Sequence, residues 1–191
     1  PRNIKINFIN CNYLNFKIKK KYDLILTNPP FGKINENNLS KDLCSLKNKV
    51  KTNNLFALFL YKSCQEAKYV AYISPKSILN APEYNKLRLI LNKLFLVSLH
   101  DYGEKAFKGV LIETIFIQLS IKNDLNKKVI FRSLINNETL KINQKYMQDE
   151  KLPNWLIYRN KNFDKLLSKL KLDIFDFFRD RQITKKNSTH L

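Results

Sequence analysis

The hydrophobic and polar positions of this chain follow alternating patterns, some typical of strands and some typical of helices. Residues 4–8 alternate apolar and polar side chains, which predicts a strand. Residues 24–26 form a short, wholly apolar run, as in a buried strand of a parallel sheet. Apolar runs at residues 69–73 and 95–99 predict two further strands. The pattern therefore indicates a sheet with buried strands.

The segments between these predicted strands carry apolar residues at helical spacing. Residues 53–68 carry apolar side chains at steps of three and four, and an asparagine can cap the first turn. Residues 83–94 are amphipathic with the same period. This alternation of strand and helix predicts an α/β fold. We expect residues 110–121 and 129–134 to pair as a β-hairpin that ends the sheet.

Two regions lack a strong hydrophobic period. Residues 33–51 are polar and rich in lysine, which predicts a mobile loop. The character changes again at residue 136, where we expect a linker region with short helices. Its predicted parts are linkers at residues 136–138 and 144–153, an apolar patch at 155–158, and helices at 162–172 and 174–178.

The apolar run at residues 24–26 leads into the most informative stretch of the chain, which is Asn28, Pro29, Pro30 and Phe31. The two prolines fix two φ angles and stop the strand. In open α/β sheets, ligands bind at the carboxyl ends of the strands. We therefore expect this stretch to present an amide, a fixed backbone carbonyl and an aromatic ring at a binding edge.

These groups suit the activation of an exocyclic amino group on a nucleobase. The lone pair of such an amine is delocalised into the ring, so the nitrogen is a poor nucleophile. Two acceptors, the Asn28 side-chain oxygen and the Pro29 carbonyl, would draw the nitrogen towards tetrahedral geometry. Phe31 would stack on a base that has left the duplex. The alternative is an ordinary turn with Phe31 in the core, but the preceding apolar strand favours the functional interpretation.

The stretch from Asn28 to Phe31 resembles the catalytic motif of the amino-methyltransferases that use S-adenosylmethionine, in which Asn, Asp or Ser precedes two prolines and an aromatic residue. With asparagine first and an apolar strand before it, the chain is similar to the adenine-N6 DNA methyltransferases of restriction–modification systems. The resemblance covers residues 4–122 and implies the later part of a Rossmann-like methyltransferase sheet that ends in the β-hairpin. The motif also recurs in enzymes that methylate RNA guanine or protein glutamine, which leaves the substrate open.

The same resemblance implies roles for further residues. Asn12 stands where the family has an acid that contacts the adenine of the cofactor, and Phe59 where an aromatic residue packs against that adenine. Phe107 matches an aromatic residue that packs on the flipped base. Each residue has a structural alternative, namely a plain Asx turn at Asn12, helix core at Phe59 and hairpin core at Phe107.

Composition points to a polyanionic partner. The 191 residues include 35 Lys and Arg against 16 Asp and Glu, a formal net charge of +19, which favours nucleic acid and, with the resemblance, double-stranded DNA. Coding bias in an AT-rich genome is the alternative source of this charge. The three cysteines lack metal-ligand spacing, and no run of ~18 apolar residues would span a membrane. We therefore expect a cytoplasmic protein with reduced thiols, no metal site and no membrane contact.

Glycine is scarce in this chain. There are three glycines, where average usage of ~7% would give about thirteen, and none of them forms the Gly-x-Gly turn that a Rossmann-like domain normally uses to approach a cofactor. We therefore expect a fragment whose residues 1–135 are a partial catalytic domain and whose residues 136–191 are a linker and the start of a target-recognition region. A partner or a missing segment would supply the glycine-rich loop.

The expected activity is methyl transfer from S-adenosylmethionine to the N6 of a flipped adenine in DNA. Asn28 and Pro29 would orient the amine, Phe31 and Phe107 would hold the base, and other residues would line the cofactor. A second hypothesis, from another functional class, is an inert nucleic-acid-binding fragment or subunit that keeps the fold and the charge. A third is methylation of RNA or protein with the same motif.

Overall fold

The chain divides into two units, Pro1–Tyr158 and Arg159–Leu191. The first unit contains a β-sheet with helices, and the described part of the second contains helix α5, Lys161–Leu167. The computed structural model describes residues 4–35, 39–107, 109, 111–122, 128–149, 152, 154–159 and 161–170.

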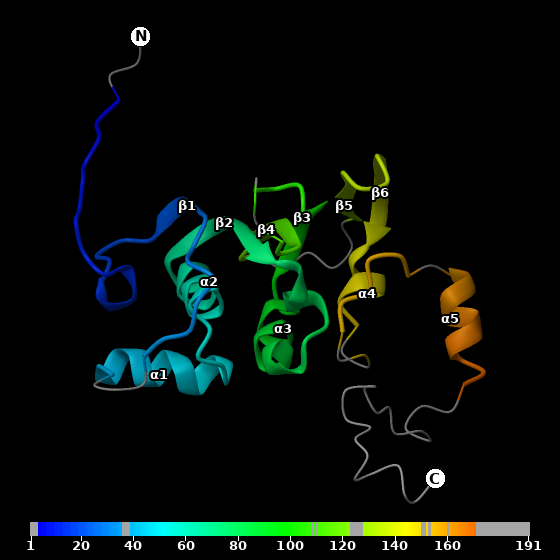
Figure 1. Ribbon diagram of the computed structural model, residues 1–191, viewed down its shortest axis with the longest axis horizontal. Coiled ribbons are helices and arrows are strands. Elements are labelled where there is room, and N and C mark those ends of the chain that lie inside the picture. Colours follow the sequence, from blue (N-terminus) through cyan, green and yellow to red (C-terminus); the bar gives the residue numbers. More distant parts are fainter. Residues whose placement is uncertain are drawn as a thin grey trace, which may run out of the picture. The chain divides into compact units, whose positions relative to one another are not determined.

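Six strands form one mixed sheet in the order β1-β2-β4-β3-β5-β6. Strands β1, β2, β3 and β5 run in the same direction, whereas β4 and β6 run antiparallel to their neighbours (Figure 1). The α/β fold predicted from the sequence is confirmed. The strands are Tyr22–Thr27 (β1), Ala67–Pro75 (β2), Phe95–Gly103 (β3), Thr114–Ser120 (β4), Lys128–Ser133 (β5) and Glu138–Asn143 (β6).

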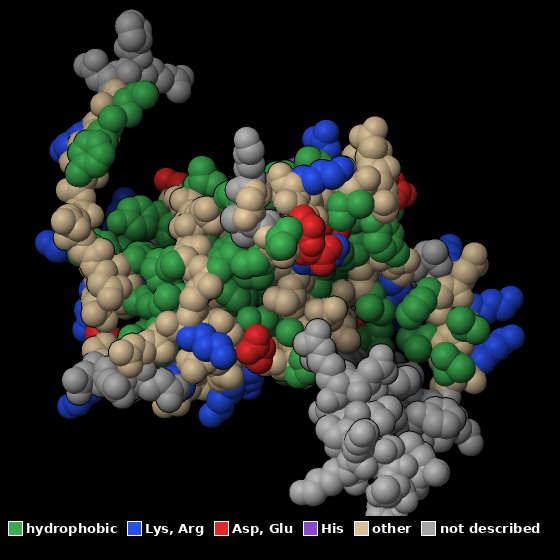
Figure 2. Space-filling model, viewed as in Figure 1, with side chains coloured by type: hydrophobic (Ala, Val, Ile, Leu, Met, Phe, Trp, Pro, Cys, Tyr) green, Lys and Arg blue, Asp and Glu red, His purple; other side chains and the backbone are tan. Residues whose placement is uncertain are grey.

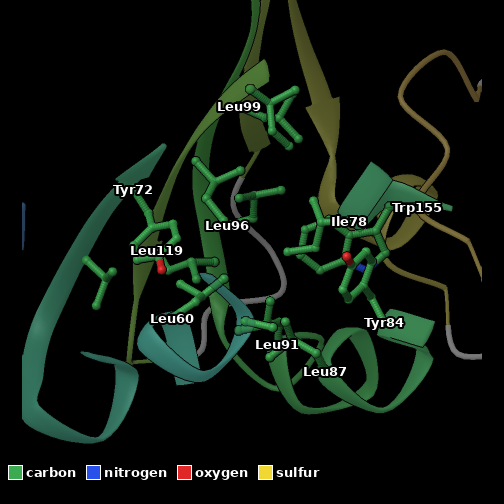
Figure 3. Close-up of a cluster of buried hydrophobic side chains, with 14 of the residues drawn as sticks. Leu60, Tyr72, Ile78, Tyr84, Leu87, Leu91, Leu96, Leu99, Leu119 and Trp155 are labelled. Carbon is green, nitrogen blue, oxygen red and sulfur yellow. The ribbon is translucent and has the colours of Figure 1, made fainter. Parts of the chain in front are cut away.

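Helices α1, Lys41–Val50, α2, Leu55–Glu66, and α3, Asn85–Leu91, lie on one side of the sheet (Figure 1). Side chains of α2, α3 and the strands meet there in a buried hydrophobic cluster (Figure 3). Within it, the hydroxyl of Tyr72 on β2 donates to the carbonyl oxygen of Phe56 on α2 at 2.6 Å, so the buried hydroxyl is satisfied. Among the described residues, no helix combines the length and the apolar character needed to cross a membrane.

Strand β1 is less covered than the other parallel strands. It pairs with β2 and with no other described strand. Tyr22, Leu24 and Leu26 alternate along one face of β1 and are 44%, 53% and 73% exposed, and Tyr69 on β2 is 47% exposed. Figure 2 shows hydrophobic side chains gathered over β1 and β2. In the described part of the chain, β1 therefore offers both a free hydrogen-bonding edge and an apolar face.

The predicted strand at residues 4–8 is wrong. These residues belong to no strand, and the side chains of Ile4, Ile6 and Phe8 are 82%, 67% and 92% exposed. Alternation of apolar and polar residues forms a stable strand only where a neighbouring strand accepts its backbone hydrogen bonds and a core accepts its apolar face. No described strand does so here.

The predicted loop at residues 33–51 is corrected over much of its length, because α1 occupies Lys41–Val50. Ser40 caps the helix by accepting a hydrogen bond from the Leu43 backbone nitrogen at 3.2 Å. Val50 is fully buried, and Leu43 and Leu46 pack partly against the core. Packing of Val50, Leu43 and Leu46 against the core therefore stabilises the helix even though lysines interrupt its apolar residues.

The predicted β-hairpin between residues 110–121 and 129–134 is also wrong. Strand β4 lies between β2 and β3, where Ile117 stands opposite both Tyr72 and Leu99. Strand β5 pairs with β3 in parallel, and the antiparallel hairpin that ends the sheet is β5 with β6. Burial explains why β4 takes the central position in the sheet and β5 a position nearer the edge. Strand β4 is buried along most of its length, whereas β5 alternates buried and exposed residues.

The region after residue 136 is more ordered than a linker. Strand β6 belongs to the sheet, and helix α4, Gln144–Met147, follows it directly. The Trp155 indole donates to Asn92 Oδ1 at 2.7 Å, and its backbone nitrogen donates to the carbonyl of Leu79 at 2.8 Å. The predicted helix at 162–172 is seen as α5, while 174–178 lies outside the described residues. The functional division at residue 135 stays a prediction.

A buried arginine ties the connection after β2 to α3. Arg88 is 2% exposed, and its Nη1 donates to the carbonyl oxygens of Ile78 at 2.8 Å and Ala81 at 2.9 Å. Its Nη2 donates to Asn85 Oδ1. Burial lowers the pKa of Arg88 from its usual value, as expected for a cation removed from water. The guanidinium thus supplies a donor to the buried carbonyl oxygen of Ile78 and a second donor to that of Ala81, which also accepts from the Tyr84 backbone nitrogen at 3.1 Å.

We expect Arg88→Met to lower the free energy of unfolding by roughly 1–3 kcal/mol, because the buried carbonyl oxygen of Ile78 loses its donor. Urea unfolding followed by the fluorescence of Trp155 measures this change. Lys86→Met is the matched control, because Lys86 lies exposed on the same helix and should change stability by less than about 0.5 kcal/mol. Equal effects of the two variants would contradict the assigned role of Arg88.

Candidate active site at the carboxyl edge of the sheet

Strand β1 ends at Thr27, and the next residues form the carboxyl edge of the sheet. Asn28 is exposed, Pro29 is buried and Pro30 is exposed. The Asn28 side chain makes no hydrogen bond with any residue that the structure describes. Its amide is therefore available to a ligand, on a backbone held by the pairing of Thr27 with Tyr72 and by two proline rings.

Phe31 is half-buried against the start of α2. Its ring meets the ring of Phe56 edge to face, with centroids 6.2 Å apart and planes at 73°, and it packs partly against the core. The carbonyl of Gly32 accepts a hydrogen bond from the Leu55 backbone nitrogen at 2.7 Å. Phe31 was predicted either to stack on a base or to pack in the core. Core contacts fix its position, while part of the ring remains accessible. Its predicted stacking role stays a prediction.

The topology brings Phe107 to the same edge of the sheet. Strands β1, β2 and β3 are parallel, so the segments that follow them emerge together. Phe107 lies in the connection from β3 to β4 and is 37% exposed. The carboxyl edge of the sheet therefore carries Asn28 after β1, Lys76 after β2 and Phe107 after β3. Such an edge is where open α/β sheets bind ligands.

The predicted cofactor residues Asn12 and Phe59 come together through Tyr13. Asn12 precedes a short 3₁₀ helix, Tyr13–Asn15, and its Oδ1 accepts a hydrogen bond from the Leu14 backbone nitrogen at 3.0 Å. The rings of Tyr13 and Phe59 have centroids 5.2 Å apart. The Asx-type turn proposed as the alternative for Asn12 is thus present, and the two N–H groups of its amide donate to no residue that the structure describes.

A polar network that sequence analysis missed anchors this segment to α2. The Tyr13 hydroxyl donates to Glu66 Oε2 at 2.7 Å and lies 3.1 Å from Ser63 Oγ. Lys62 forms an ion pair with Glu66 and donates to the carbonyl of Phe16 at 2.8 Å. Burial, partly offset by Ser63 and reinforced by Glu66, raises the pKa of Tyr13. The spacing of Lys62 and Glu66 by four residues is the signal that indicates such a pair.

Helix α2 connects the two groups of candidate residues. Phe56 contacts Phe31 at the carboxyl edge, and Phe59, one turn later, contacts Tyr13. Residues three apart lie on the same side of a helix, separated by about 4.5 Å along its axis. The same helix therefore holds both the candidate base-binding residues and the candidate cofactor residues.

Burial raises the pKa of the nearby Cys64 thiol to about 12, which makes it a poor nucleophile.

Comparison with known proteins finds relatives of this chain. The profile of the family described as Eco57I restriction-modification methylase matches residues 2–107. The Type II methyltransferase M.VspI of Vibrio sp. (strain 343) is 32% identical over 113 residues, which are 56% of this chain and 26% of that protein. The Type II methyltransferase M.AccI of Acinetobacter calcoaceticus is 33% identical over 141 residues, which are 68% of this chain and 26% of that protein. The chain thus spans about a quarter of the length of these relatives.

Solved structures share the fold at low sequence identity. A structure of the type I restriction–modification system has a TM-score of 0.53 and 17% identity, covering 66% of this chain and 27% of that chain. A Listeria monocytogenes protein described as a class I S-adenosylmethionine-dependent methyltransferase has a TM-score of 0.51 and 16% identity, covering 63% of this chain and 39% of that chain. These likenesses show the fold.

The anchoring network predicts the effect of removing one hydroxyl. Tyr13→Phe keeps the ring contact with Phe59 but removes the donor to Glu66, so we expect local opening to become easier by about 1–2 kcal/mol. Amide hydrogen exchange at Phe16 measures this as an acceleration of roughly 5- to 30-fold. Tyr22→Phe is the control. The Tyr22 side chain is 44% exposed, so removing its hydroxyl should leave the exchange rate at Phe16 unchanged. Equal acceleration in both variants would rule out the network as the anchor.

Proposed function

Because this chain belongs to the family of Eco57I restriction-modification methylases, we propose that it forms the part of a DNA methyltransferase that binds a target adenine and activates its N6 amine. The observation that carries this proposal is the exposed Asn28 amide, free of hydrogen bonds to the described residues, at the carboxyl edge of the sheet. The curated relatives are Type II methyltransferases. The whole reaction is proposed for the assembly to which this chain belongs.

Asn28 and Pro29 are the proposed acceptors for the two N–H bonds of the amine. Gripping both bonds localises the nitrogen lone pair and aims it away from the acceptors. Pro29 is buried, so its carbonyl is held in a fixed direction, and it has no N–H that would compete for an acceptor. Preorganised acceptors of this kind accelerate a reaction without a general base, because they need no reorganisation as charge develops. S-Adenosylmethionine would supply the methyl group from its sulfonium centre.

Phe31 and Phe107 are the proposed aromatic contacts of the extruded base. A base inside a duplex cannot reach Asn28, so the target nucleotide must leave the stack. Phe31 is held from behind by Phe56, and Phe107 is 37% exposed. Stacking on two rings would compensate part of the cost of unstacking, at ~1–3 kcal/mol for each base–aromatic contact.

The residues near Tyr13 fit the adenine end of the cofactor. The N–H groups of Asn12, which have no acceptor among the described residues, can donate to a ring nitrogen, and Phe59 offers a half-buried ring. The chain has no Gly-x-Gly turn for the rest of the cofactor. We propose that another segment or partner pairs with the free edge of β1 and supplies that turn. Covering the exposed side chains of Leu24 and Leu26 would require that this segment also pack against the face of the sheet.

Asn28→Ala tests the chemistry in the active assembly, meaning this chain together with the segment proposed to pair with β1. Loss of one preorganised contact should reduce methyl transfer by ~100- to 1,000-fold, while DNA affinity changes little because phosphate contacts dominate it. The measurement is methyl transfer to an adenine-containing duplex at saturating cofactor, beside a binding assay on the same DNA. Asn10→Ala, at an exposed asparagine outside the site, is the control.

Methylation by Asn28→Ala at a rate near that of the unmodified protein would leave the stretch as a simple turn. Parallel assays with RNA and with protein substrates test the other two substrate classes, and transfer to adenine N6 is identified by digesting the product to nucleosides. DNA binding without any methyl transfer in the complete assembly would favour an inert nucleic-acid-binding subunit, for which the net charge of +19 is the supporting observation.

The charge predicts a strong salt dependence of DNA binding. If exposed lysines contact phosphates, the logarithm of the binding constant should fall with the logarithm of salt concentration, with a slope of about −0.9 for each contact. Fluorescence anisotropy of a labelled duplex between low and physiological salt measures the slope. A flat dependence, or no binding at low salt, would mean that the lysine excess is compositional.

A further inference from the structure

An ion cluster at the carboxyl edge of the sheet has no role in the function proposed above. Lys76 is the first residue after β2, and its Nζ lies 3.0 Å from Asp101 Oδ2 and 3.0 Å from Glu113 Oε1. The side chain of Asp101 is 3% exposed, that of Lys76 25% and that of Glu113 52%. Three segments of the chain therefore meet at one ammonium group.

The two carboxylates stand at the two ends of the connection that carries Phe107. Asp101 lies at the end of β3, where its Oδ1 accepts a hydrogen bond from the Gly103 backbone nitrogen at 3.0 Å. Glu113 directly precedes β4, and its carbonyl oxygen accepts a hydrogen bond from the Lys76 backbone nitrogen at 2.8 Å. Lys76 thus holds the start of the connection through one carboxylate and its end through the other.

The geometry at the start of the connection leaves little freedom. Gly103 has a φ of +55°, and a Cβ at this position would lie 2.8 Å from Ile135 Cδ1. The hydroxyl of Thr114 donates to the carbonyl oxygen of Ile112 at 3.2 Å. These contacts fix both ends of the connection, while Phe107 itself stays accessible at 37% exposure.

Electrostatics favours the charged form of this cluster. Burial acts to lower the pKa of Lys76, but its hydrogen bonds to Asp101 and Glu113 outweigh burial, and the pKa is raised above its usual value. The buried Asp101 carboxylate requires such a partner, because an unpaired buried charge is costly. Lys76 therefore remains protonated at neutral pH.

We propose that Lys76 is a positioning residue, which holds the connection between β3 and β4 so that Phe107 faces the extruded base. This inference rests on the proposed function, since it assigns Lys76 a role through Phe107. Lys76 acts by holding Asp101 and Glu113, which flank Phe107 along the chain, so that less conformational entropy is lost when the base binds. Its effect is thus felt in retention of the base.

A double-mutant cycle with Phe107 tests the proposal in the active assembly. Phe107→Ala should reduce methyl transfer by about 5- to 150-fold, the range that loss of one base–aromatic stack produces. Lys76→Met should reduce it in the same direction, and Lys76→Arg should restore most of the rate. If Lys76 acts through Phe107, Lys76→Met should have little further effect once Phe107 is alanine, because the two substitutions remove the same interaction.

Lys68→Met is the matched control. Lys68 lies near the opposite end of the same strand and also pairs with an aspartate, with its Nζ 2.7 Å from Asp23 Oδ1. This substitution removes the same charge and another lysine–aspartate pair, which is exposed rather than buried, so it should leave methyl transfer at saturating DNA unchanged. A second readout is 2-aminopurine at the target position of the duplex, whose fluorescence reports whether the base is held out of the stack. Lys76→Met should change this signal as Phe107→Ala does.

The cycle separates this inference from the proposed function. If Phe107→Ala and Asn28→Ala both leave methyl transfer unchanged, the proposed function fails. The positioning role is overturned if Phe107→Ala slows the reaction but Lys76→Met has no more effect than Lys68→Met. It is also overturned if the effects of Lys76→Met and Phe107→Ala on the rate multiply in the double variant. Should Lys76→Met fail to fold, Glu113→Gln decides by the same criterion. It weakens the cluster at its more exposed partner and should slow the reaction unless Phe107 is already alanine.

Discussion

The insertion of β4 between β2 and β3 is the interaction on which the rest of the structure depends. Strand β4 hydrogen-bonds to both neighbours in antiparallel register, and its inward side chains Ile115, Ile117 and Leu119 are fully buried. One antiparallel strand between two others forces those two to run in the same direction. The segments after β2 and β3 therefore emerge at one edge, together with the segment after β1. Lys76 and Phe107 lie at the same edge because of this arrangement, and the parallel pairing of β1 with β2 brings Asn28 there as well.

Helix α2 gives that edge its second support. It buries Phe56 and Leu60 in the cluster against the sheet and at the same time contacts Phe31 and Tyr13 through its aromatic residues. A packed helix is far more rigid than a loop, because core side chains interdigitate at close to crystal density. The proposed base-binding and cofactor-binding residues thus share one rigid element, although they lie far apart along the chain.

Ion pairs in this protein fall into two classes by burial. Lys62 with Glu66 and Lys76 with Asp101 are largely removed from solvent, so losing one partner would leave a charge with little hydration. The pairs of Lys17 with Asp42 and of Lys68 with Asp23 are exposed, so water screens them and they contribute little to stability. Lys62 and Lys76 are thus neutralised by carboxylates within the fold. The exposed lysines carry the part of the net charge of +19 that a polyanion would meet.

The sequence by itself determined the α/β class, the strand before Asn28 and the helix that became α2. These segments have strong local patterns, since an apolar run closed by two prolines or a helical period of large side chains allows few conformations. It also identified Asn28, Pro29, Pro30 and Phe31 as one stretch. Their order along the chain already implies a strand end with an exposed polar residue.

Tertiary structure decided which strands pair and which residues meet. The alternation at residues 4–8 predicted a strand that no described strand accepts. Strand β4, within the run predicted to form a hairpin, pairs with β2 and β3 instead of the following strand. Pairing depends on burial contributed by distant segments, which local periodicity does not encode. The same holds for Lys76, whose carboxylate partners are 25 and 37 residues away along the chain. No local pattern marks such a cluster, because only the folded sheet brings its three members to one point.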